Sequence, residues 1–206
     1  MSPTRDPKSV VRAGYDAVSR RYRADDAADG AYAEAVVLIE EYVVAGAPIL
    51  DLGCGCGVPV ARRLSLRYAV TGIDFSPVQI GRARTVVPAA VFMCADMTTA
   101  RFDDASFDAV VCLYALIHVP LAEQLPLLHR VARWLRPGGA FVATVGDRAW
   151  TGVEHDWLGV KGADMWWSHA DAATYRQWLR EVGLRLELER SVPEGDSRHT
   201  FVFATK

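Results

Sequence analysis

The sequence predicts an α/β fold built around one mostly parallel sheet with helices on both faces. Short runs rich in Val, Ile and Leu alternate with stretches of helical spacing, which is the pattern of strands joined by crossover helices. Most of these runs are apolar throughout, as expected of strands covered on both faces. The chain has 206 residues, 51% of them hydrophobic, which is enough for one core and too few for two full-sized enzyme domains.

Seven segments are predicted to be strands because each is a short run of apolar and β-branched residues. In chain order they are residues 48–51, 69–74, 90–94, 107–113, 140–145, 184–190 and 200–204. No helical pattern separates the last two segments. We therefore expect these two to form an antiparallel hairpin at one edge of the sheet.

Helices are predicted between the other strands, with two more ahead of the first strand. Ser76 followed by Pro77 is a helix-start signal. Leu121, Leu125 and Leu128 begin an apolar stripe on one helix, which the Arg-Pro-Gly-Gly run from Arg136 ends. The predicted helices are residues 58–66, 77–84, 121–135 and 171–181, with two leading helices within 9–45.

Residues 146–170 interrupt the alternation of strands and helices. They hold four tryptophans among glycines and charged residues, without clean periodicity. A long insertion inside a compact domain is typical of a lid or a binding loop. We therefore expect this segment to cover the sheet. Tryptophans that line the site would favour an aromatic or amine-bearing acceptor, and core packing is the default alternative for each of them.

Charge and hydropathy exclude several classes of partner. A net charge of −2 leaves no bulk electrostatic attraction for nucleic acid or an anionic membrane. No apolar run approaches the roughly 18 residues of a membrane span, and no secretory signal begins the chain, so we expect a soluble cytoplasmic protein with reduced cysteines. The cysteine spacing predicts no metal site.

The most informative stretch runs from Ile49 to Gly57, a strand that leads into a Gly-x-Gly-x-Gly turn. Glycines let the backbone approach a ligand closely, and the turn aims unpaired N–H groups of the following helix at it. In a nicotinamide fingerprint the third glycine falls one position later, where this chain has Val58. The spacing therefore opposes a dinucleotide, while a tight turn without any ligand stays open as an alternative.

Acidic residues follow three neighbouring strands at the points where those strands end. They are Asp51, Asp74 and Asp96. Ser76 fills the helix-capping role, which leaves Asp74 available to a ligand. Open α/β sheets bind ligands at this edge, and three acids there suit a ligand with sugar hydroxyls, amines and net positive charge.

Five motifs in order resemble the class I S-adenosylmethionine-dependent methyltransferases, especially the small bacterial ubiquinone-biosynthesis type. They are the segments 49–57, 70–76, 95–97, 106–113 and 135–139, within a resemblance that covers about residues 10–145. The resemblance implies a Rossmann-like sheet of seven strands, the last antiparallel, behind an N-terminal helical lid. It divides the single domain into a lid (1–45), a cofactor-binding core (46–145), a substrate-cap insertion (146–170) and a final helix and hairpin (171–206).

The resemblance also implies roles for individual residues in binding S-adenosylmethionine and its product S-adenosylhomocysteine. Asp74 matches the residue that binds the ribose hydroxyls, Asp96 the one that contacts the adenine amine, and Met97 the one that packs beside the adenine. Tyr15 and Tyr22 share one face of a leading helix that folds over the cofactor; packing of that helix is their alternative role. The remaining cofactor-binding residues are Asp51, Gly53, Cys54, Gly55, Gly57, Phe75 and Leu113.

Methyl transfer to a hydroxyl or amine is helped by a general base, and histidine is the usual candidate near neutral pH. His118 and Tyr114 follow the fourth strand, where acceptors approach in the resembled family. His155 lies in the insertion between two carboxylates, which favour a charged imidazole. A histidine bonded to the backbone and a solvated loop cluster are the respective alternatives for His118 and His155.

The acceptor is expected to be a small-molecule metabolite of a biosynthetic route, either aromatic or amine-bearing. The segment after the fourth strand lacks the Asn-Pro-Pro-Tyr-type tetrad of enzymes that methylate DNA amines, and no basic domain is present. A monomer and a homodimer both stay open. The rival functions are a cofactor-binding protein that transfers no methyl group, such as a regulatory module or a cyclase, and a nicotinamide oxidoreductase.

Overall fold

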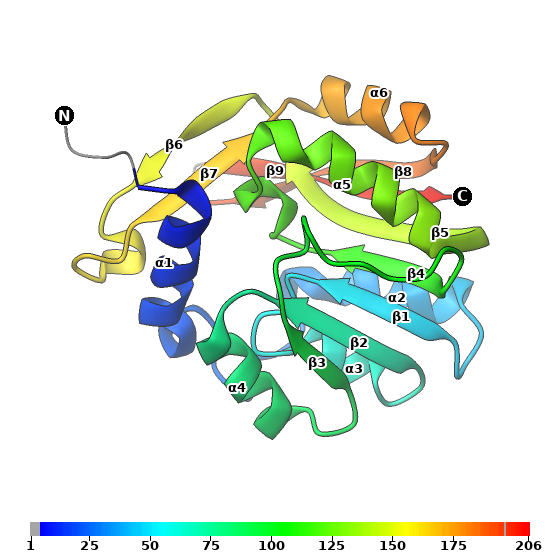
Figure 1. The fold of residues 1–206 in the computed structure, drawn as a ribbon, viewed down its shortest axis with the longest axis horizontal. Coiled ribbons are helices and arrows are strands. Elements are labelled where there is room, and N and C mark those ends of the chain that lie inside the picture. Colours follow the sequence, from blue (N-terminus) through cyan, green and yellow to red (C-terminus); the bar gives the residue numbers. More distant parts are fainter. Residues whose placement is uncertain (1–4, 196) are drawn as a thin grey trace.

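Seven strands form one twisted sheet in the computed structural model, which describes residues 5–195 and 197–206 (Figure 1). The strand order is β3-β2-β1-β4-β5-β9-β8, and β9 runs antiparallel to both of its neighbours. The predicted terminal hairpin and antiparallel last strand are therefore confirmed. The strands are β1 (Pro48–Leu52), β2 (Ala69–Asp74), β3 (Val91–Cys94), β4 (Phe107–Cys112), β5 (Leu135–Gly146), β8 (Arg185–Glu194) and β9 (Ser197–Thr205).

Helices cover both faces of the sheet, so it is the middle layer of three. One face packs on α2 (Ala33–Tyr42), α3 (Val60–Leu64) and α4 (Pro77–Val86). The other face packs on α5 (Leu121–Trp134) and α6 (Ala172–Glu181). All the predicted helices are present, with ends that differ from the prediction by at most a few residues.

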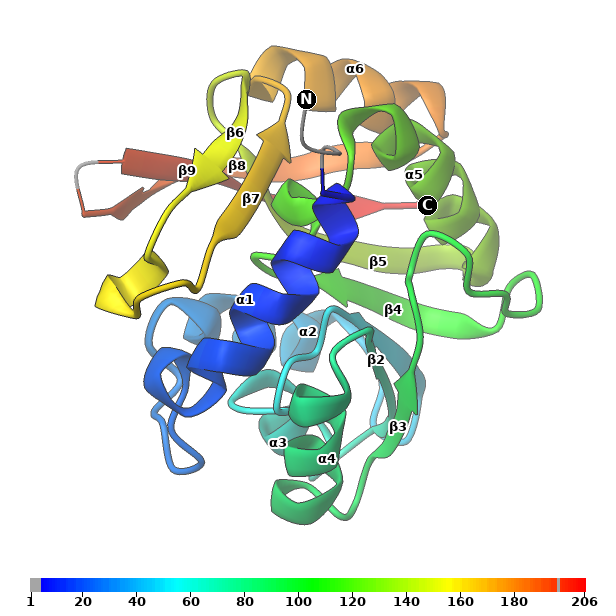
Figure 2. The ribbon, with the colours of Figure 1, turned by 60° about the vertical axis from the view of Figure 1, so that its left-hand side comes forward.

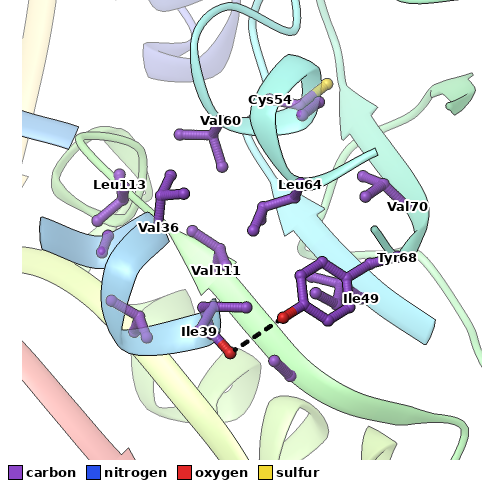
Figure 3. Close-up of a cluster of buried hydrophobic side chains, with 14 of the residues drawn as sticks. Val36, Ile39, Ile49, Cys54, Val60, Leu64, Tyr68, Val70, Val111 and Leu113 are labelled. Atoms are coloured by element: carbon purple, nitrogen blue, oxygen red, sulfur yellow. Dashed lines mark hydrogen bonds between the residues drawn. The ribbon is translucent and has the colours of Figure 1, made fainter. Parts of the chain in front are cut away.

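Successive residues of β1 point into the two cores, which explains its continuous apolar sequence. Ile49 faces α2 and α3, and Leu50 faces the opposite core; neither has any exposed surface. Each such side chain contributes roughly 1.5–3 kcal/mol by burial. Figure 3 shows the first of these cores, where the Tyr68 hydroxyl donates a hydrogen bond to the Ile39 carbonyl 3.5 Å away.

The insertion folds into a second, two-stranded sheet and not into a loop. It consists of β6 (Trp150–Glu154) and β7 (Met165–His169), joined through the short 3₁₀ helix η3 (Trp157–Gly159). The sequence shows no alternation here because both faces of β7 are partly covered. The segment lies beside α1 (Pro7–Tyr22) across the end of the main sheet, as Figure 2 shows.

Helix α1 is held over the sheet by apolar contacts with this insertion. Val11 and Val18 share a buried cluster with Trp157, Ala163 and Met165. The helix is capped by the Asp6 carboxylate, which accepts a hydrogen bond from the Ser9 N–H at 3.0 Å. These contacts place the inner face of α1 above the carboxyl ends of the parallel strands.

The predicted apolar stripe of α5 is confirmed in part. Leu128, Ala132 and Leu135 are buried, whereas Leu121 at its start is exposed. Gln124, Leu127 and Val131 also belong to the buried face. Cys94 is exposed because β3 lies at the edge of the sheet. Among the described residues no helix is long and apolar enough to span a membrane.

Candidate functional site

One cavity lies between α1 and the carboxyl ends of β1, β2 and β4, which is the edge where the sequence predicted a ligand. Thirteen of the fifteen predicted site residues line it, all except Gly57 and His155. They are Tyr15, Tyr22, Asp51, Gly53, Cys54, Gly55, Asp74, Phe75, Asp96, Met97, Leu113, Tyr114 and His118.

The glycine turn shapes the wall of the cavity next to β1. The N–H groups of Gly53 and Cys54 donate to the Ile73 carbonyl at 2.8 and 3.0 Å, which ties the turn to β2. Gly53 has a positive φ of 73°, and a Cβ there would come within 2.3 Å of the Ala115 Cβ. Gly55 has a φ of 54°, and no atom lies within 4 Å of where its Cβ would be. The backbone at Gly55 is thus open to a ligand.

Gly57 does not belong to this wall, which corrects the prediction. A Cβ at Gly57 would meet Phe92 and Val87 at 3.1 Å, so this glycine allows the turn to pack against β3 and α4. Its role is in packing behind the turn.

Asp51 is a buried carboxyl group with an unused oxygen. The residue is 4% exposed, and its Oδ2 atom has no hydrogen-bond partner among the described residues. Burial, and then the nearby Asp74 carboxylate, raise the pKa of Asp51 to about 7. An acid in this state is stabilised by a positively charged or hydrogen-donating ligand.

Asp74 holds the turn as well as facing the cavity. Its Oδ2 accepts the Gly55 N–H at 3.0 Å and its Oδ1 accepts the Ser76 N–H at 2.8 Å. Burial raises the pKa of Asp74 to about 6, although both N–H groups act in the opposite direction. Ser76 caps α4 as predicted, accepting the Gln79 N–H at 3.0 Å. Asp74 is therefore only partly free, and each oxygen keeps one lone pair for a ligand hydroxyl.

Asp96 is paired with a lysine that the sequence did not single out. The Lys8 ammonium on α1 donates to Asp96 Oδ2 at 2.9 Å, Thr98 Oγ1 at 2.6 Å and Glu123 Oε2 at 2.5 Å. Burial alone would raise the pKa of Asp96, but the hydrogen bonds from Lys8 and Thr98 outweigh it and the pKa lies below its usual value. The start of α1 is thereby fastened to the end of β3.

His118 lies in the 3₁₀ helix η2 (Leu116–His118) and uses both ring nitrogens. Its Nδ1 is 2.8 Å from the Trp166 carbonyl oxygen and its Nε2 is 3.0 Å from the Tyr15 hydroxyl. A carbonyl only accepts, so Nδ1 carries the proton and the Tyr15 hydroxyl donates to Nε2. Burial lowers the pKa of His118 to about 4, so the ring is neutral near pH 7.

Tyrosines, not tryptophans, form the aromatic lining of the cavity. Trp157 packs behind Tyr15 and Tyr22, with ring centroids 5.2 and 5.4 Å away. Trp167 packs behind His118 at 4.3 Å. Trp157 and Trp167 thus follow the core-packing alternative, because they buttress residues that line the cavity.

The segment that forms most of the cavity is similar in sequence to known proteins. Residues 49–139, which include the glycine turn and all three acids, match the model of a methyltransferase domain. This segment is similar to a methyltransferase domain.

Two relatives indicate how far this likeness extends. It is 39% identical over 102 residues to the 27-O-demethylrifamycin SV methyltransferase of Amycolatopsis mediterranei, covering 46% of this chain and 37% of that protein. It is 32% identical over 158 residues to the ubiquinone biosynthesis O-methyltransferase of Xanthomonas axonopodis pv. citri, covering 69% of this chain and 64% of that protein. The chain thus spans less than two thirds of the length of these relatives.

Solved structures share the fold of this chain along its length. The magnesium protoporphyrin IX methyltransferase of Synechocystis, crystallised with S-adenosylmethionine, superimposes with a TM-score of 0.74 at 17% identity and covers 100% of both chains. The [4+2]-cyclase SpnF superimposes with a TM-score of 0.73 at 20% identity, covering 99% of this chain and 98% of the cyclase. At these identities the likeness concerns the fold alone.

The residues of the cavity fit S-adenosylmethionine, with which the Synechocystis protein was crystallised. Asp51 presents an unpartnered buried oxygen, Gly55 presents open backbone, and Asp74 keeps lone pairs beside them. A ligand with hydroxyls and a positive charge satisfies all three positions, whereas an apolar ligand satisfies none.

The structure does not bring His155 to the cavity. Its ring Nδ1 is 3.0 Å from Asp164 Oδ1, and the side chain is 76% exposed. The solvated alternative for this histidine is the one observed. Sequence reasoning missed several lining residues, among them Lys8, Arg23 and Tyr32. None of these three stands in a motif, because each reaches the cavity through the packing of α1 and the segment after it.

Proposed function

We propose that the protein is an S-adenosylmethionine-dependent methyltransferase that methylates an O, N or S nucleophile of a small molecule. The observation that carries the proposal is the shared cavity of the strand-end acids, the open glycine turn and the Tyr15–His118 pair. When bound, S-adenosylmethionine supplies the methyl group and leaves as the thioether S-adenosylhomocysteine.

The strand-end acids are assigned to the polar parts of the cofactor. The free lone pairs of Asp74 accept the ribose hydroxyls, and the backbone at Gly55 lies beside them. Asp51 faces the positively charged end of the cofactor, whose cationic charge compensates the charge of the buried Asp51 carboxylate. Met97 and Asp96 form the adenine end, where Lys8 already orients the Asp96 carboxylate.

The Tyr15–His118 pair is assigned to the proton that the acceptor loses. As the nucleophile forms its bond to the methyl carbon, its proton passes to the Tyr15 oxygen. The Tyr15 hydroxyl proton passes at the same time to His118 Nε2, which lies 3.0 Å from the Tyr15 oxygen. The proton thus ends on the imidazole, whose other nitrogen stays bonded to the Trp166 carbonyl. The rest of catalysis is alignment of acceptor and donor in the closed cavity.

The acceptor is assigned to the tyrosine-lined part of the cavity. Tyr22, Tyr32 and Tyr114 contribute ring surface there, and the rings of Tyr32 and Tyr114 are 5.3 Å apart. Aromatic walls of this kind suit a flat, small acceptor, either aromatic or carrying an amine over a ring face. The relatives that act on ubiquinone precursors and rifamycin support a small molecule of this class.

Calorimetric titration with S-adenosylhomocysteine tests cofactor binding. We expect the wild-type protein to bind it, Asp74→Ala to weaken binding by about tenfold or more through loss of charge-assisted hydrogen bonds, and NAD not to bind. Tight NAD binding, or unchanged affinity in Asp74→Ala, would contradict the assignment.

A labelled-methyl assay against a metabolite extract separates methyl transfer from cofactor binding alone. We expect label to move to a small molecule in the presence of wild-type protein. The shared fold of SpnF makes a non-methylating reaction on the same scaffold the second candidate. Tight cofactor binding without label transfer to any fraction would favour that candidate.

A further inference from the structure

A second buried histidine lies at the same edge of the sheet as the cavity, and the proposed proton path does not use it. His199 stands near the start of β9, where it pairs with Gly146 at the end of β5. The residue is only 6% exposed. Because β5 runs parallel to β4, its end lies at the edge that carries the cavity. His199 is thereby brought next to the site without belonging to its lining.

The two ring nitrogens of His199 have different surroundings. Nε2 lies 2.7 Å from Glu194 Oε2, so the neutral ring donates its N–H to this carboxylate. Nδ1 is buried and has no hydrogen-bond partner among the described residues. The carboxylate thus selects the tautomer in which Nδ1 is an acceptor. A buried acceptor without a partner lowers stability, so a ligand group that donates to it gains a favourable interaction.

A tryptophan of the insertion presents the complementary group. The Trp167 ring is stacked on that of His199, with centroids 6.4 Å apart and planes inclined by 21°. Its Nε1 is also buried and has no hydrogen-bond partner within the part of the chain that the structure describes. The two rings therefore hold one unused acceptor and one unused donor. A hydroxyl group satisfies both, because it donates through its hydrogen and accepts through its oxygen.

Two residues that line the cavity also pack on these rings. The Tyr114 ring meets His199 edge-on at 5.7 Å, and the His118 ring lies 4.3 Å from Trp167. Tyr114 has a φ of 54°, a left-handed conformation that residues other than glycine seldom adopt. Backbone strain of this kind is concentrated at functional sites. Tyr114 therefore forms the boundary between the cavity and His199.

Metal binding does not explain the histidines of this region. The rings of His169 and His199 are 6.3 Å apart, but no three His, Cys, Asp or Glu side chains of the described residues are placed to hold a metal ion. The Nδ1 atoms of His118 and His169 are each bonded to a backbone carbonyl. The unpartnered nitrogen of His199 is thus the feature that a ligand would satisfy.

We propose that His199 and Trp167 form a subsite for a hydroxyl group of the acceptor, distinct from the group that is methylated. The hydroxyl donates to His199 Nδ1 and accepts from Trp167 Nε1, while Glu194 holds the imidazole in the accepting tautomer. The Tyr114 side chain turns aside to admit it. The inference rests on the proposed methyl transfer and adds that the acceptor carries a hydroxyl besides its nucleophile.

The cofactor also carries hydroxyls, but the order of the strands favours the acceptor as their source here. The ribose hydroxyls are assigned to Asp74, which ends β2. Strands β1, β4 and β5 lie between β2 and β9, so His199 stands on the far side of the cavity from Asp74. Measuring cofactor affinity in the same variants separates the two sources.

The test compares catechol, resorcinol and hydroquinone with phenol, which has one hydroxyl. Calorimetry in oxygen-free buffer near pH 8 measures their binding to protein saturated with S-adenosylhomocysteine. His199→Phe keeps a ring and removes both nitrogens, whereas His199→Asn keeps an acceptor oxygen close to the position of Nδ1. Trp167→Phe removes only the donor of the pair. His155→Phe, at the exposed histidine of the insertion, is the matched control.

We expect at least one of the three benzenediols to bind wild type and His155→Phe about tenfold or more tightly than phenol, because its second hydroxyl makes two hydrogen bonds. His199→Phe should lose this preference, and Trp167→Phe and His199→Asn should each retain part of it. The affinities for phenol and for S-adenosylhomocysteine should change less than about threefold in every variant.

Three other outcomes are distinguishable. Equal affinity of wild type for phenol and all three benzenediols, or a preference that survives in both His199→Phe and Trp167→Phe, would contradict the subsite. A loss of S-adenosylhomocysteine affinity in His199→Asn and Trp167→Phe would assign the hydroxyl to the cofactor and overturn the acceptor assignment. If His199→Phe unfolds, His199→Asn and Trp167→Phe decide the question. Failure of wild type to bind S-adenosylhomocysteine would instead contradict the proposed function.

Discussion

Asp51 is the residue whose ionisation responds most strongly to a cationic ligand. Its pKa of about 7 in the free protein reflects burial and the neighbouring Asp74 carboxylate. A bound positive charge favours the carboxylate and lowers this pKa, so binding releases a proton below about pH 7. Affinity for S-adenosylmethionine should therefore rise as pH increases to about 7 and level off above it.

Asp51→Asn tests this linkage. The variant should bind S-adenosylmethionine more weakly, by about tenfold at pH 8, and should lose the pH dependence between about pH 6 and 8. Calorimetry in buffers of different ionisation enthalpy counts the protons released. A pH slope that survives in Asp51→Asn would assign the titrating group elsewhere, with Asp74 as the first candidate because its pKa is about 6.

The Tyr15–His118 hydrogen bond gives a second prediction for single residues. Tyr15→Phe keeps the ring that packs on Trp157 but removes the hydroxyl, and His118→Gln removes the base. Both should lower turnover by about 10²-fold or more while cofactor affinity changes only a few-fold. The exposed His129→Gln is the control. Turnover requires an acceptor, so the measurement follows its identification; equal turnover in all three variants would contradict the proton path.

We expect turnover to show no decrease near pH 6.5 of the kind that protonation of an ordinary histidine base would cause. The buried His118 has a pKa of about 4, so it stays neutral and able to accept a proton down to that range. Acidification from about pH 8 to 6 should not protonate His118. Any loss of rate in this pH range should instead come from protonation of Asp51, which weakens the binding of S-adenosylmethionine.

Helix α1 is the element on which the upper wall of the cavity depends. It supplies Lys8, Tyr15 and Tyr22, and its C-terminal end presents Arg23. Gly14 lets the helix approach β7 closely, because a Cβ at this position would come within 2.4 Å of the Asp164 carbonyl oxygen. The position of α1 is therefore set by a backbone contact that tolerates no side chain.

Gly14→Ala should push α1 away from the insertion. We expect a loss of about 1–3 kcal/mol of stability and a weaker affinity for S-adenosylhomocysteine, because Tyr15 and Lys8 move with the helix. Gly81→Ala in α4 is the matched control, since nothing lies within 4 Å of its Cβ position, and it should stabilise by about 0.5–1 kcal/mol. Thermal unfolding and calorimetry measure both; a neutral Gly14→Ala would contradict the close approach.

Elements differ in how well the sequence predicted them. The seven strands of the main sheet were predictable because burial on both faces leaves nearly continuous apolar runs, as in Ile49–Leu52. The strands β6 and β7 were not, because tryptophans, Gly152 and charged residues share a hairpin whose faces are unevenly covered. The apolar stripe of α5 was predicted in part: Leu128 and Ala132 are buried as expected. The burial of Gln124 beside them was not predictable, because it depends on hydrogen bonds to the Val119 and Ser168 carbonyls.

At the scale of the whole molecule, the candidate site was also predictable in part. Asp51, Asp74 and Asp96 were predictable because parallel strands end at one edge of a sheet, so strand-end residues converge whatever the rest of the chain does. Lys8, Arg23 and Tyr32 depend on where α1 and the segment after it pack, which no local pattern encodes. The partly engaged Asp74 and the tyrosine lining likewise became visible only in three dimensions.

Ligand binding should stabilise the folded molecule as a unit. S-adenosylhomocysteine at about 100 times its dissociation constant adds about 2.7 kcal/mol to the free energy of unfolding. For a chain of this size that corresponds to a rise in melting temperature of about 5–10 °C. NAD at the same concentration should produce no shift, and a larger shift with NAD would favour the oxidoreductase alternative.

The location of the cofactor in this cavity is tested most directly by a crystal structure of the protein with S-adenosylhomocysteine. We predict its ribose hydroxyls on the Asp74 carboxylate, its adenine beside Met97 and its sulfur facing the Tyr15–His118 side of the cavity. Density for the compound outside this cavity, or a ribose that makes no contact with Asp74 at saturating concentration, would contradict the account.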